Sequence, residues 1–435
     1  MRIQKPHSYK ISKLAKFSII LSIIPAIYTA LFPNKIAVIT MLCSYPLIPI
    51  LFFLLRKEMN KNFDGFFFVK LFYLYNIIVL VRGLFDAHSS TDWNVMFSST
   101  IPLFLFIHFS IYLVSYRASM SKVFSVYLSY GLFLALIVLI IPVEYNFGFP
   151  QVISPICVMA FLIPFLNRKY FLFITSIALV SFFSDISNRS NMLNIIVSFL
   201  IVSTSLFKNK QFILLIIKKM RALFLILPIL FLVLGVMGIF NIFQVGNLYS
   251  DIKISDDSGK NQEVFVDSRT SIYIDVFSQL IKDDAVLFGL GSSGKTETSL
   301  IDVTSADFSE IYKEGRRSTE SGMLNYIQWG GIVGGMVYFL LFVKASYYGI
   351  FKSRNWFCIM LGLWVAYKGL FSFIEDRISF SISSLFIFIS LGICLNKNIR
   401  LMSDEKIKLI SIQILNKSVI LNFLTPRRNL VNKYQ

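Results

Sequence analysis

Charged residues are scarce in this chain, and cysteines are scarcer still. Asp, Glu, Lys and Arg make up 15% of the 435 residues, whereas hydrophobic residues make up 56%. This balance lies outside the range of soluble globular domains and is typical of membrane proteins. The four cysteines fall inside apolar runs without CxxC or metal-type spacing. The sequence therefore supports neither a disulfide framework nor a zinc site, and we expect no metal and no cofactor.

Acidic residues are also few compared with basic ones. There are 24 Asp and Glu against 42 Lys and Arg, which gives a net charge of +18. Such a surplus can indicate nucleic-acid binding, but here the basic residues form short clusters between apolar runs instead of lining one polar face. We therefore expect no nucleic-acid partner, and we interpret the clusters as signals of membrane orientation.

Long apolar runs are abundant, and a helix of about twenty apolar residues can cross a membrane. The fold class expected is all-α, a polytopic integral membrane protein with about 12 transmembrane helices. The expected spans are residues 16–32, 36–55, 65–84, 97–116, 123–142, 152–166, 170–183, 193–207, 222–243, 324–347, 356–374 and 378–395. The seventh and eighth spans are short, so one broken hairpin is an alternative to two crossings.

The distribution of charge predicts the orientation of the chain, because Lys and Arg are retained on the cytoplasmic side. The polar stretch 244–322 holds 14 of the 24 acidic residues but 8 of the 42 basic ones. We expect residues 1–243 to carry spans one to nine, 244–323 to form a large periplasmic loop, 324–395 to carry spans ten to twelve, and 396–435 to form a basic cytoplasmic tail. The predicted location is the bacterial inner membrane, with both termini cytoplasmic.

The loop contains a predicted amphipathic helix over residues 267–282. Ile272, Val276 and Leu280 recur at four-residue steps, which places them on one helix face. Arg269 would stand in the first turn, where unpaired N–H groups and the helix dipole favour an anion.

A phosphate-loop pattern follows this helix. The segment Gly289-Leu-Gly-Ser-Ser-Gly-Lys-Thr296 matches GxxxxGK[ST] at every defined position. Its predicted place in an outer loop, away from ATP, argues against an ATPase. The N–H groups of the turn at Gly289 and Gly291 are still expected to cradle a pyrophosphate.

Arginines form another signal on the predicted outer side. They are Arg82, Arg189, Arg269, Arg316 and Arg317. An arginine near the lipid core costs about 2.5–3.5 kcal/mol on insertion scales, so these positions require an explanation. Planar guanidinium groups suit phosphate oxygens. The alternative is that each arginine pairs with a nearby acid for structural reasons.

Other candidates lie where the loop returns to the membrane. Glu320 is a candidate base, with a solvated loop carboxylate as the alternative. Lys368, inside the eleventh span and about two turns from Glu375 and Asp376, is expected to extend its ammonium group toward the interface, with a relay as the alternative. Close packing of the tenth span against a neighbouring helix is predicted by Gly330, Gly331, Gly334 and Gly335.

These motifs, in this order around the longest loop, resemble those of Wzy-type O-antigen polymerases and more distantly those of O-antigen ligases. The resemblance rests on the turn at 188–194, on Ser268-Arg269 before the amphipathic helix, on Phe288-Gly-Leu-Gly291, and on 320–324 leading into 329–334. Ligases carry a histidine just before the equivalent of the tenth span. Residues 319–322 offer none, which favours a polymerase and leaves the identity of the base open.

The resemblance implies a GT-C-like architecture and a metal-independent glycosyltransferase. Its substrates would be undecaprenyl-pyrophosphate-linked oligosaccharides, joined on the periplasmic face to make O-antigen. Its other partners would be membrane lipids and a chain-length regulator protein. Catalytic roles are expected for Glu320 as the base and for Arg269 and Arg189 at the departing pyrophosphate. Supporting contacts to pyrophosphate or glycan are expected from Arg82, Arg316, Arg317, Gly289 and Gly291.

Three other functions remain as alternatives. An O-antigen ligase would transfer the polymer to a different acceptor. A flippase for lipid-linked oligosaccharides would have a similar number of spans but no outer loop of this length. A solute transporter of another kind is compatible with the hydropathy alone.

Overall fold

Helices dominate the computed structural model of the chain, in agreement with the predicted all-α class. The structure describes residues 16, 19, 20, 63–114, 117–131, 153–184, 189–236, 253–255, 261–263, 268–297, 315–376 and 378–416. The first two predicted spans lie almost wholly outside these residues, as does the second half of the fifth. The short strands β1 (Lys253–Ser255) and β2 (Asn261–Glu263) pair antiparallel.

The described helices follow one another from residue 66 to residue 416. These are α4 (Phe66–Asp86), α5 (Ser90–Val95), η2 (Met96–Thr100), η3 (Leu103–Ile107), η4 (His108–Val114), α6 (Arg117–Val126), η5 (Tyr127–Gly131), α9 (Ile156–Met159) and η6 (Ala160–Phe165). The next are α10 (Arg168–Ser184), α11 (Arg189–Ser203), η7 (Thr204–Leu206) and α12 (Lys210–Val236). The last are α13 (Ser268–Lys282), α15 (Gly322–Phe351), α16 (Trp356–Phe371), α17 (Ile382–Leu395), α18 (Lys397–Arg400) and α19 (Asp404–Asn416).

Four of the described helical segments are long and apolar enough to cross a membrane. They are Phe66–Asp86, Ser90–Val114, Arg189–Leu206 and Gly322–Phe351. These segments coincide with the third, fourth, eighth and tenth predicted spans, whereas twelve crossings remain a prediction. Helices α10 and α11 are separate and joined side by side, because the Asn191 amide donates to the carbonyl and hydroxyl of Ser181 at 3.3 and 3.2 Å.

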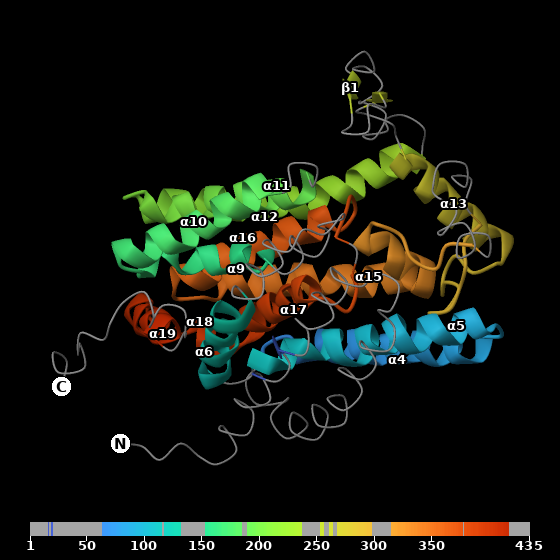
Figure 1. Ribbon diagram of the computed structural model, residues 1–435, viewed down its shortest axis with the longest axis horizontal. Helices are drawn as coiled ribbons and strands as arrows, with labels where there is room; N and C mark the ends of the chain where they lie inside the picture. The colour runs from blue at the N-terminus through green and yellow to red at the C-terminus, as the bar shows by residue number, and fades with distance from the viewer. Residues whose placement is uncertain are drawn as a thin grey trace.

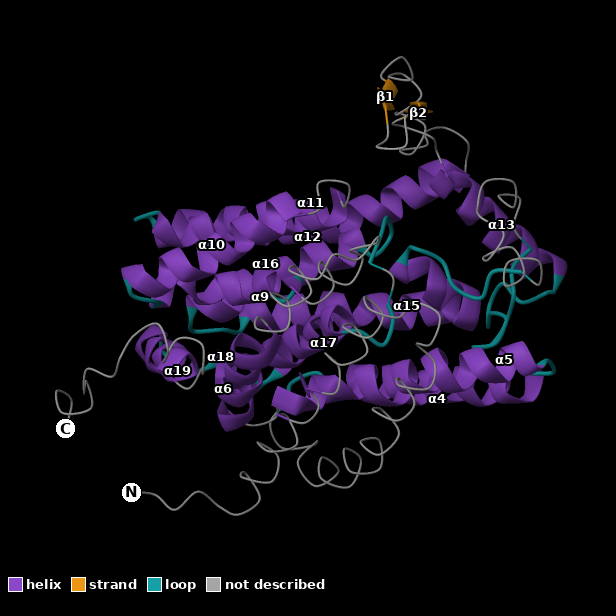
Figure 2. Cartoon of the chain, in the orientation of Figure 1, coloured by secondary structure: helices purple, strands orange, loops and turns teal. Residues whose placement is uncertain are grey.

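The core lies where α15, α16 and α17 pack together and α4 covers one side of α15 (Figure 1). Aromatic side chains fill it, with the Tyr326 and Tyr338 rings stacked at 3.9 Å and Phe72 beside them. On α4, Phe67 and Phe85 are exposed, as a lipid-facing helix requires. Figure 2 shows that α4, α12, α15 and α16 run along the long axis.

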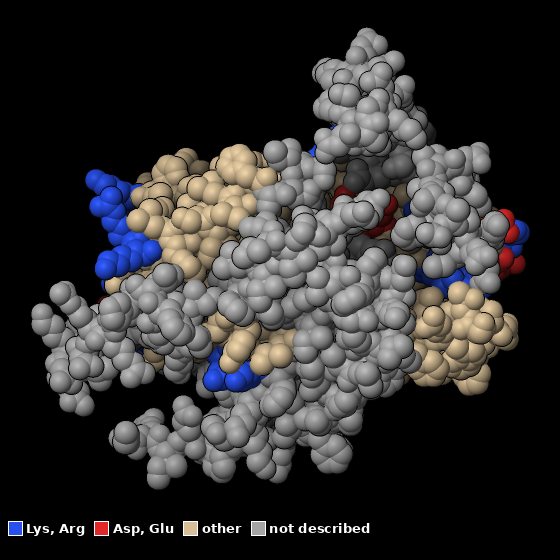
Figure 3. Space-filling view, in the orientation of Figure 1, with Lys and Arg blue, Asp and Glu red and all other residues tan. Residues whose placement is uncertain are grey.

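Basic residues gather at one end of this bundle. Figure 3 shows Lys and Arg concentrated where α10 and α12 begin, where Arg168, Lys169 and Lys210 are exposed. The α13 helix and α5 lie at the opposite end (Figure 1), which we call the α13 end. At the basic end α19 packs on α6 and η6, and Arg400 pairs with Asp64.

Candidate functional site

The turn around Gly289 and Gly291 inserts into a break in α15. The helix is interrupted at Gly331, whose φ of 65° and ψ of −166° are not helical. The N–H groups of Leu290 and Gly291 donate to the α15 carbonyls three and two residues before the break, at 2.8 and 3.0 Å. The N–H groups of Ile332 and residue 333 donate back to the carbonyls at 286 and 287. The turn and the break therefore satisfy each other's backbone groups, as an apolar environment requires.

The turn at 289–291 and the break in α15 at Gly331 form what we call the joint, and glycine is required on both of its sides. A Cβ atom on Gly289 would lie 2.3 Å from the nitrogen of Gly331, and a Cβ on Gly331 would lie 2.3 Å from the backbone of Leu287. Both residues also have positive φ, which side-chain-bearing residues adopt only with strain. The expectation that Gly331 mainly serves helix packing is wrong, because this glycine makes room for the turn.

Arg82 holds the same turn from the end of α4. Its Nη1 and Nη2 atoms donate to the carbonyls of Phe288 and Gly289 at 2.7 and 2.9 Å. The N–H of Gly289 donates to Ala285, and that of Gly291 to α15, so neither amide points to a ligand. The predicted phosphate cradle at Gly289 and Gly291 is therefore corrected to a structural joint, which Arg82 secures.

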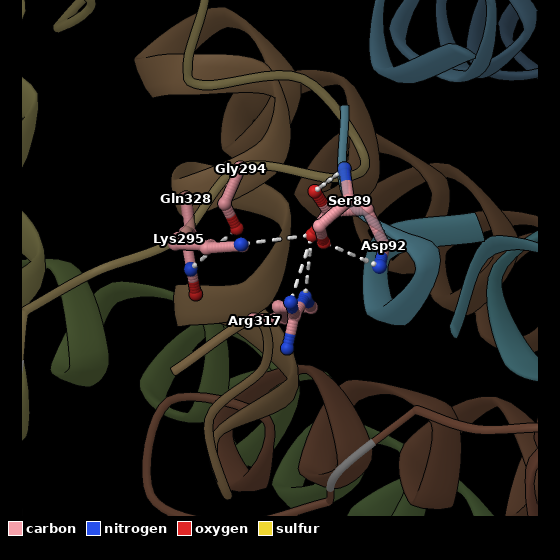
Figure 4. Close-up of polar contacts among 6 residues, drawn as sticks. All are labelled: Ser89, Asp92, Gly294, Lys295, Arg317 and Gln328. Carbon is pink, nitrogen blue, oxygen red and sulfur yellow. Dashed lines mark hydrogen bonds and ion pairs between the residues drawn. The ribbon is translucent and has the colours of Figure 1, made fainter. Parts of the chain in front are cut away.

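Asp92 binds two cations beside the joint (Figure 4). Arg317 donates through Nε and Nη2 to Asp92 Oδ1 at 3.1 and 2.7 Å, and Lys295 Nζ lies 3.0 Å from the same oxygen. The other oxygen accepts the Ser89 N–H at 3.0 Å, while Asp92 N–H donates to the Ser89 hydroxyl. This capping box begins α5 and fixes the carboxylate. The side chains of Asp92 and Arg317 are only 6% and 7% exposed. Removal of either one would therefore leave the other buried charge without this partner, which destabilises the fold.

Arg316 precedes this pair on a backbone ladder. Its N–H and carbonyl exchange hydrogen bonds with Thr296 at 2.7 and 2.9 Å, and the Gln328 amide donates to its carbonyl at 2.9 Å. The Trp329 indole donates to the Arg317 carbonyl at 3.0 Å. The two predicted arginines are thus held by α15, with Arg317 turned to Asp92 and Arg316 half-buried.

A cavity of about 470 Å³ opens beside Asp92. Its lining includes Asp86, His88, Ser293 and Lys295, so carboxylate, imidazole, hydroxyl and ammonium groups surround one space. Within the described parts of the chain, no group of three or more His, Cys, Asp or Glu side chains is placed to hold a metal ion.

The segment carrying Glu320 lies against the end of α16. The Ser321 hydroxyl donates to the carbonyl at 372 (2.9 Å), and the Gly322 N–H donates to the carbonyl at 375 (2.9 Å). Ser321 also caps α15 by accepting the Leu324 N–H. Glu320 is exposed, and no partner for its carboxylate lies among the residues described.

Helix α13 meets the same place. The Tyr273 hydroxyl donates to the Phe373 carbonyl at 2.6 Å, and it lies 3.5 Å from the Ser321 hydroxyl. Burial raises the pKa of Tyr273 to about 12, so it remains a donor at neutral pH. Arg269 lies one turn earlier on α13, and its side chain is outside the described set.

Lys368 on α16 connects helix α11 to the same place. Its Nζ atom lies 2.6 Å from both carboxylate oxygens of Asp376 and 3.1 Å from Oδ1 of Asn194. The expectation that Lys368 extends to the interface is wrong, because its side chain is 4% exposed and ion-paired. Arg189 begins α11, is exposed, and lies five residues before Asn194.

Three predicted catalytic residues therefore lie on segments that converge. Arg189, Arg269 and Glu320 each stand within five residues of a side chain that contacts residues 368–376. Sequence reasoning missed Asp92, Asn194 and the pairing of Asp376. The Ser89-x-x-Asp92 spacing is a helix-start signal that could have drawn attention to Asp92.

Comparison of the chain with protein-family models found no match, and comparison with curated proteins and with solved structures found none either.

Proposed function

We propose that this protein is an O-antigen polymerase of the bacterial inner membrane. It would join undecaprenyl-pyrophosphate-linked repeat units on the periplasmic face, with the α13 end directed to the periplasm. The observation that supports this function is the convergence of the segments bearing Arg189, Arg269 and Glu320 on the end of α16. Arg189 lies 80 residues before Arg269, and Arg269 lies 51 residues before Glu320, so the fold and not the sequence order brings these segments together.

The chemistry requires charge of both signs. The bond between the anomeric carbon of the growing chain and its pyrophosphate oxygen breaks, while a bond to a hydroxyl oxygen of the incoming unit forms. Negative charge develops on the departing lipid pyrophosphate, and Arg189 and Arg269 stabilise it by charge-assisted hydrogen bonds. The hydroxyl proton passes to a carboxylate, for which Glu320 is the exposed candidate.

The remaining predicted residues take supporting roles. Arg82, Gly289 and Gly291 position the 285–297 segment against α15. Arg317 holds one wall of the cavity through Asp92, and Arg316 is proposed to support binding of the pyrophosphate. The cavity would receive a sugar of the repeat unit.

The orientation rests on charge. Exposed Arg168, Lys169 and Lys210 stand at the end opposite α13. Because Lys and Arg are retained in the cytoplasm during insertion, this end would be cytoplasmic. The α13 end would then face the compartment in which lipid-linked glycans are polymerised.

The surface polysaccharide of a deletion strain tests the proposal. A polymerase deletion leaves lipopolysaccharide with a single repeat unit, and complementation restores a ladder. A ligase deletion leaves polymer on the lipid carrier instead, and a flippase deletion leaves no repeat unit on lipopolysaccharide. An unchanged ladder in the deletion strain would refute all three functions.

A further inference from the structure

A buried charge pair stands beside the proposed reaction site without a part in the chemistry described above. Lys368 on α16 and Asp376, five residues after this helix ends, are 4% and 12% exposed in their side chains. The ammonium group is also placed over the Trp364 and Phe371 rings, at 5.5 and 5.1 Å. An ionisable pair in such an apolar setting is costly to keep, which is why buried charges in membranes usually serve function.

Two hydrogen-bonding groups without a described partner lie on the helices that carry or pack against this pair. The hydroxyls of Tyr338 on α15 and Tyr367 on α16 are buried and have no hydrogen-bond partner within the described structure. Buried polar groups are nearly always paired, so these hydroxyls are donors that a bound polar group could use.

The backbone ties this pair to the segment of Glu320. Asp376 forms a bridge with Ser321 and has a φ of 65°, which a non-glycine residue adopts only when its surroundings impose it. Lys368 contacts Asn194, five residues after Arg189. The cation therefore lies deeper in the bundle than Arg189 and Glu320, which are exposed, and it is linked to their segments through Asn194 and Asp376.

We propose that Lys368 is a further binding residue for a lipid-linked diphosphate, and that Asp376 is the counter-ion which occupies it at rest. This inference rests on the proposed function. The diphosphate of a polyprenyl lipid is anchored at the membrane interface, so a cation inside a span meets it at the appropriate depth. The phosphate oxygens replace the Asp376 carboxylate on the ammonium group and accept hydrogen bonds from the two tyrosines. No covalent bond changes in this exchange.

Diphosphate affinity of an Asp376 variant tests the exchange directly. In Asp376→Asn the competing carboxylate is lost while size and one oxygen acceptor are kept. Undecaprenyl diphosphate, titrated into the full-length protein in detergent, should bind about tenfold more tightly than to the unmodified protein. Unchanged or weaker binding would overturn the inference. If the pair were purely structural, breaking it would not increase the affinity for undecaprenyl diphosphate.

Two lysine variants supply the complementary result. Lys368→Gln should lose at least about tenfold in affinity for undecaprenyl diphosphate, whereas Lys344→Gln should bind normally, since Lys344 lies elsewhere on α15 over Phe68. The exchanged variant, Lys368→Asp with Asp376→Lys, keeps a pair but moves the cation. It should accumulate in the membrane and still bind poorly. Normal binding by this exchanged variant would show that only pairing matters.

Failure of this inference is distinguishable from failure of the proposed function. If the deletion strain loses its ladder but Asp376→Asn binds no more tightly, the polymerase stands and the role of Lys368 does not. If the ladder is unchanged in the deletion strain, the polymerase falls whatever Lys368 binds. Inorganic pyrophosphate in parallel titrations separates recognition of the headgroup from recognition of the lipid.

Discussion

At the scale of single residues, the arginines divide into two kinds. Arg82 and Arg317 are engaged with protein acceptors, the carbonyls of a turn and the Asp92 carboxylate. Arg189 and Arg269 stand at the first turns of α11 and α13, where the helix dipole favours an anion. The same residue type therefore builds the scaffold in one place and, by our proposal, binds substrate in another.

Loss of Arg317 should destabilise the protein. Arg317→Ala leaves the buried Asp92 with only the partly exposed Lys295, and removal of one partner of a buried pair costs about 3–5 kcal/mol. Unfolding in mixed detergent micelles, followed by circular dichroism, measures this cost. The double variant Arg317→Met with Asp92→Leu should recover much of it. A cost below about 1 kcal/mol for Arg317→Ala would mean that the pair behaves as a surface salt bridge.

Loss of Arg269 should instead affect activity. Arg269→Ala should collapse the polysaccharide ladder to one repeat unit while the amount of protein in the membrane stays normal, because a contact to the departing pyrophosphate is lost. A gel of surface polysaccharide with an immunoblot measures both. Lys282→Ala, at the exposed far end of α13, is the matched control and should leave the ladder intact. Normal ladders in both Arg269→Ala and Arg189→Ala would remove the role proposed for these residues.

At the scale of elements, the joint between the glycine turn and α15 is the feature on which the α13 end depends. The Gly289 turn, the 294–296 segment and the Arg317 carbonyl all hydrogen-bond to the first three turns of α15. The cavity walls at Ser293 and Lys295 belong to the same segment. A change in the joint therefore reaches the site without touching a charged residue.

Gly331→Ala should show this dependence. The new Cβ would lie 2.3 Å from the Leu287 backbone at a φ of +65°. The conformational strain alone is about 1–3 kcal/mol, because φ 65° with ψ −166° is a region that only glycine adopts readily, and the backbone clash adds to it. We expect a lower melting temperature and a lost ladder. Gly369→Ala is the matched control, because its nearest contact is 3.1 Å to a Phe342 side-chain atom and its backbone is helical. Equal melting temperatures for both variants would contradict the role of the joint.

How much of this was predictable differs from element to element. The helices of α4, α11 and α15 follow from apolar length, which is a local property of the chain. The Asp92–Arg317 pair joins residues 225 positions apart, and no periodicity encodes such a distance. The break at Gly331 was hidden because small-residue spacing in a span also serves helix packing. Lys368 was misjudged for a different reason, because spacing alone does not tell whether a lysine about two turns from an acid reaches that acid or the interface.

At the scale of the whole molecule, charge asymmetry and the place of the site agree. Exposed Arg168, Lys169 and Lys210 lie at one end, and the segments proposed to handle a diphosphate lie at the other. Exposed apolar side chains on α4, α10 and α12 occupy the sides between them, among them Phe67, Phe183 and Ile226. Such a band is what a bilayer-embedded bundle presents to lipid.

Labelling of single cysteines tests this orientation. Cys157, Cys358 and Cys394 are buried, so a chain with all four native cysteines changed to alanine serves as background. In intact cells, a membrane-impermeant maleimide should label Asp283→Cys at the α13 end but not Lys210→Cys. Permeabilised cells should label both. Labelling of Lys210→Cys alone in intact cells would invert the molecule and withdraw the glycan-joining function.

The interrupted α15 also constrains how the protein is made. Amide groups without partners cost several kcal/mol each inside a bilayer, so the bend at Gly331 has no stable form until residues 286–291 have arrived. These residues leave the ribosome before residue 331 does. During biogenesis, the nascent helix would then bend at Gly331 and bind the preceding turn in a single step. A chain that failed to complete this step would be a target for membrane proteases.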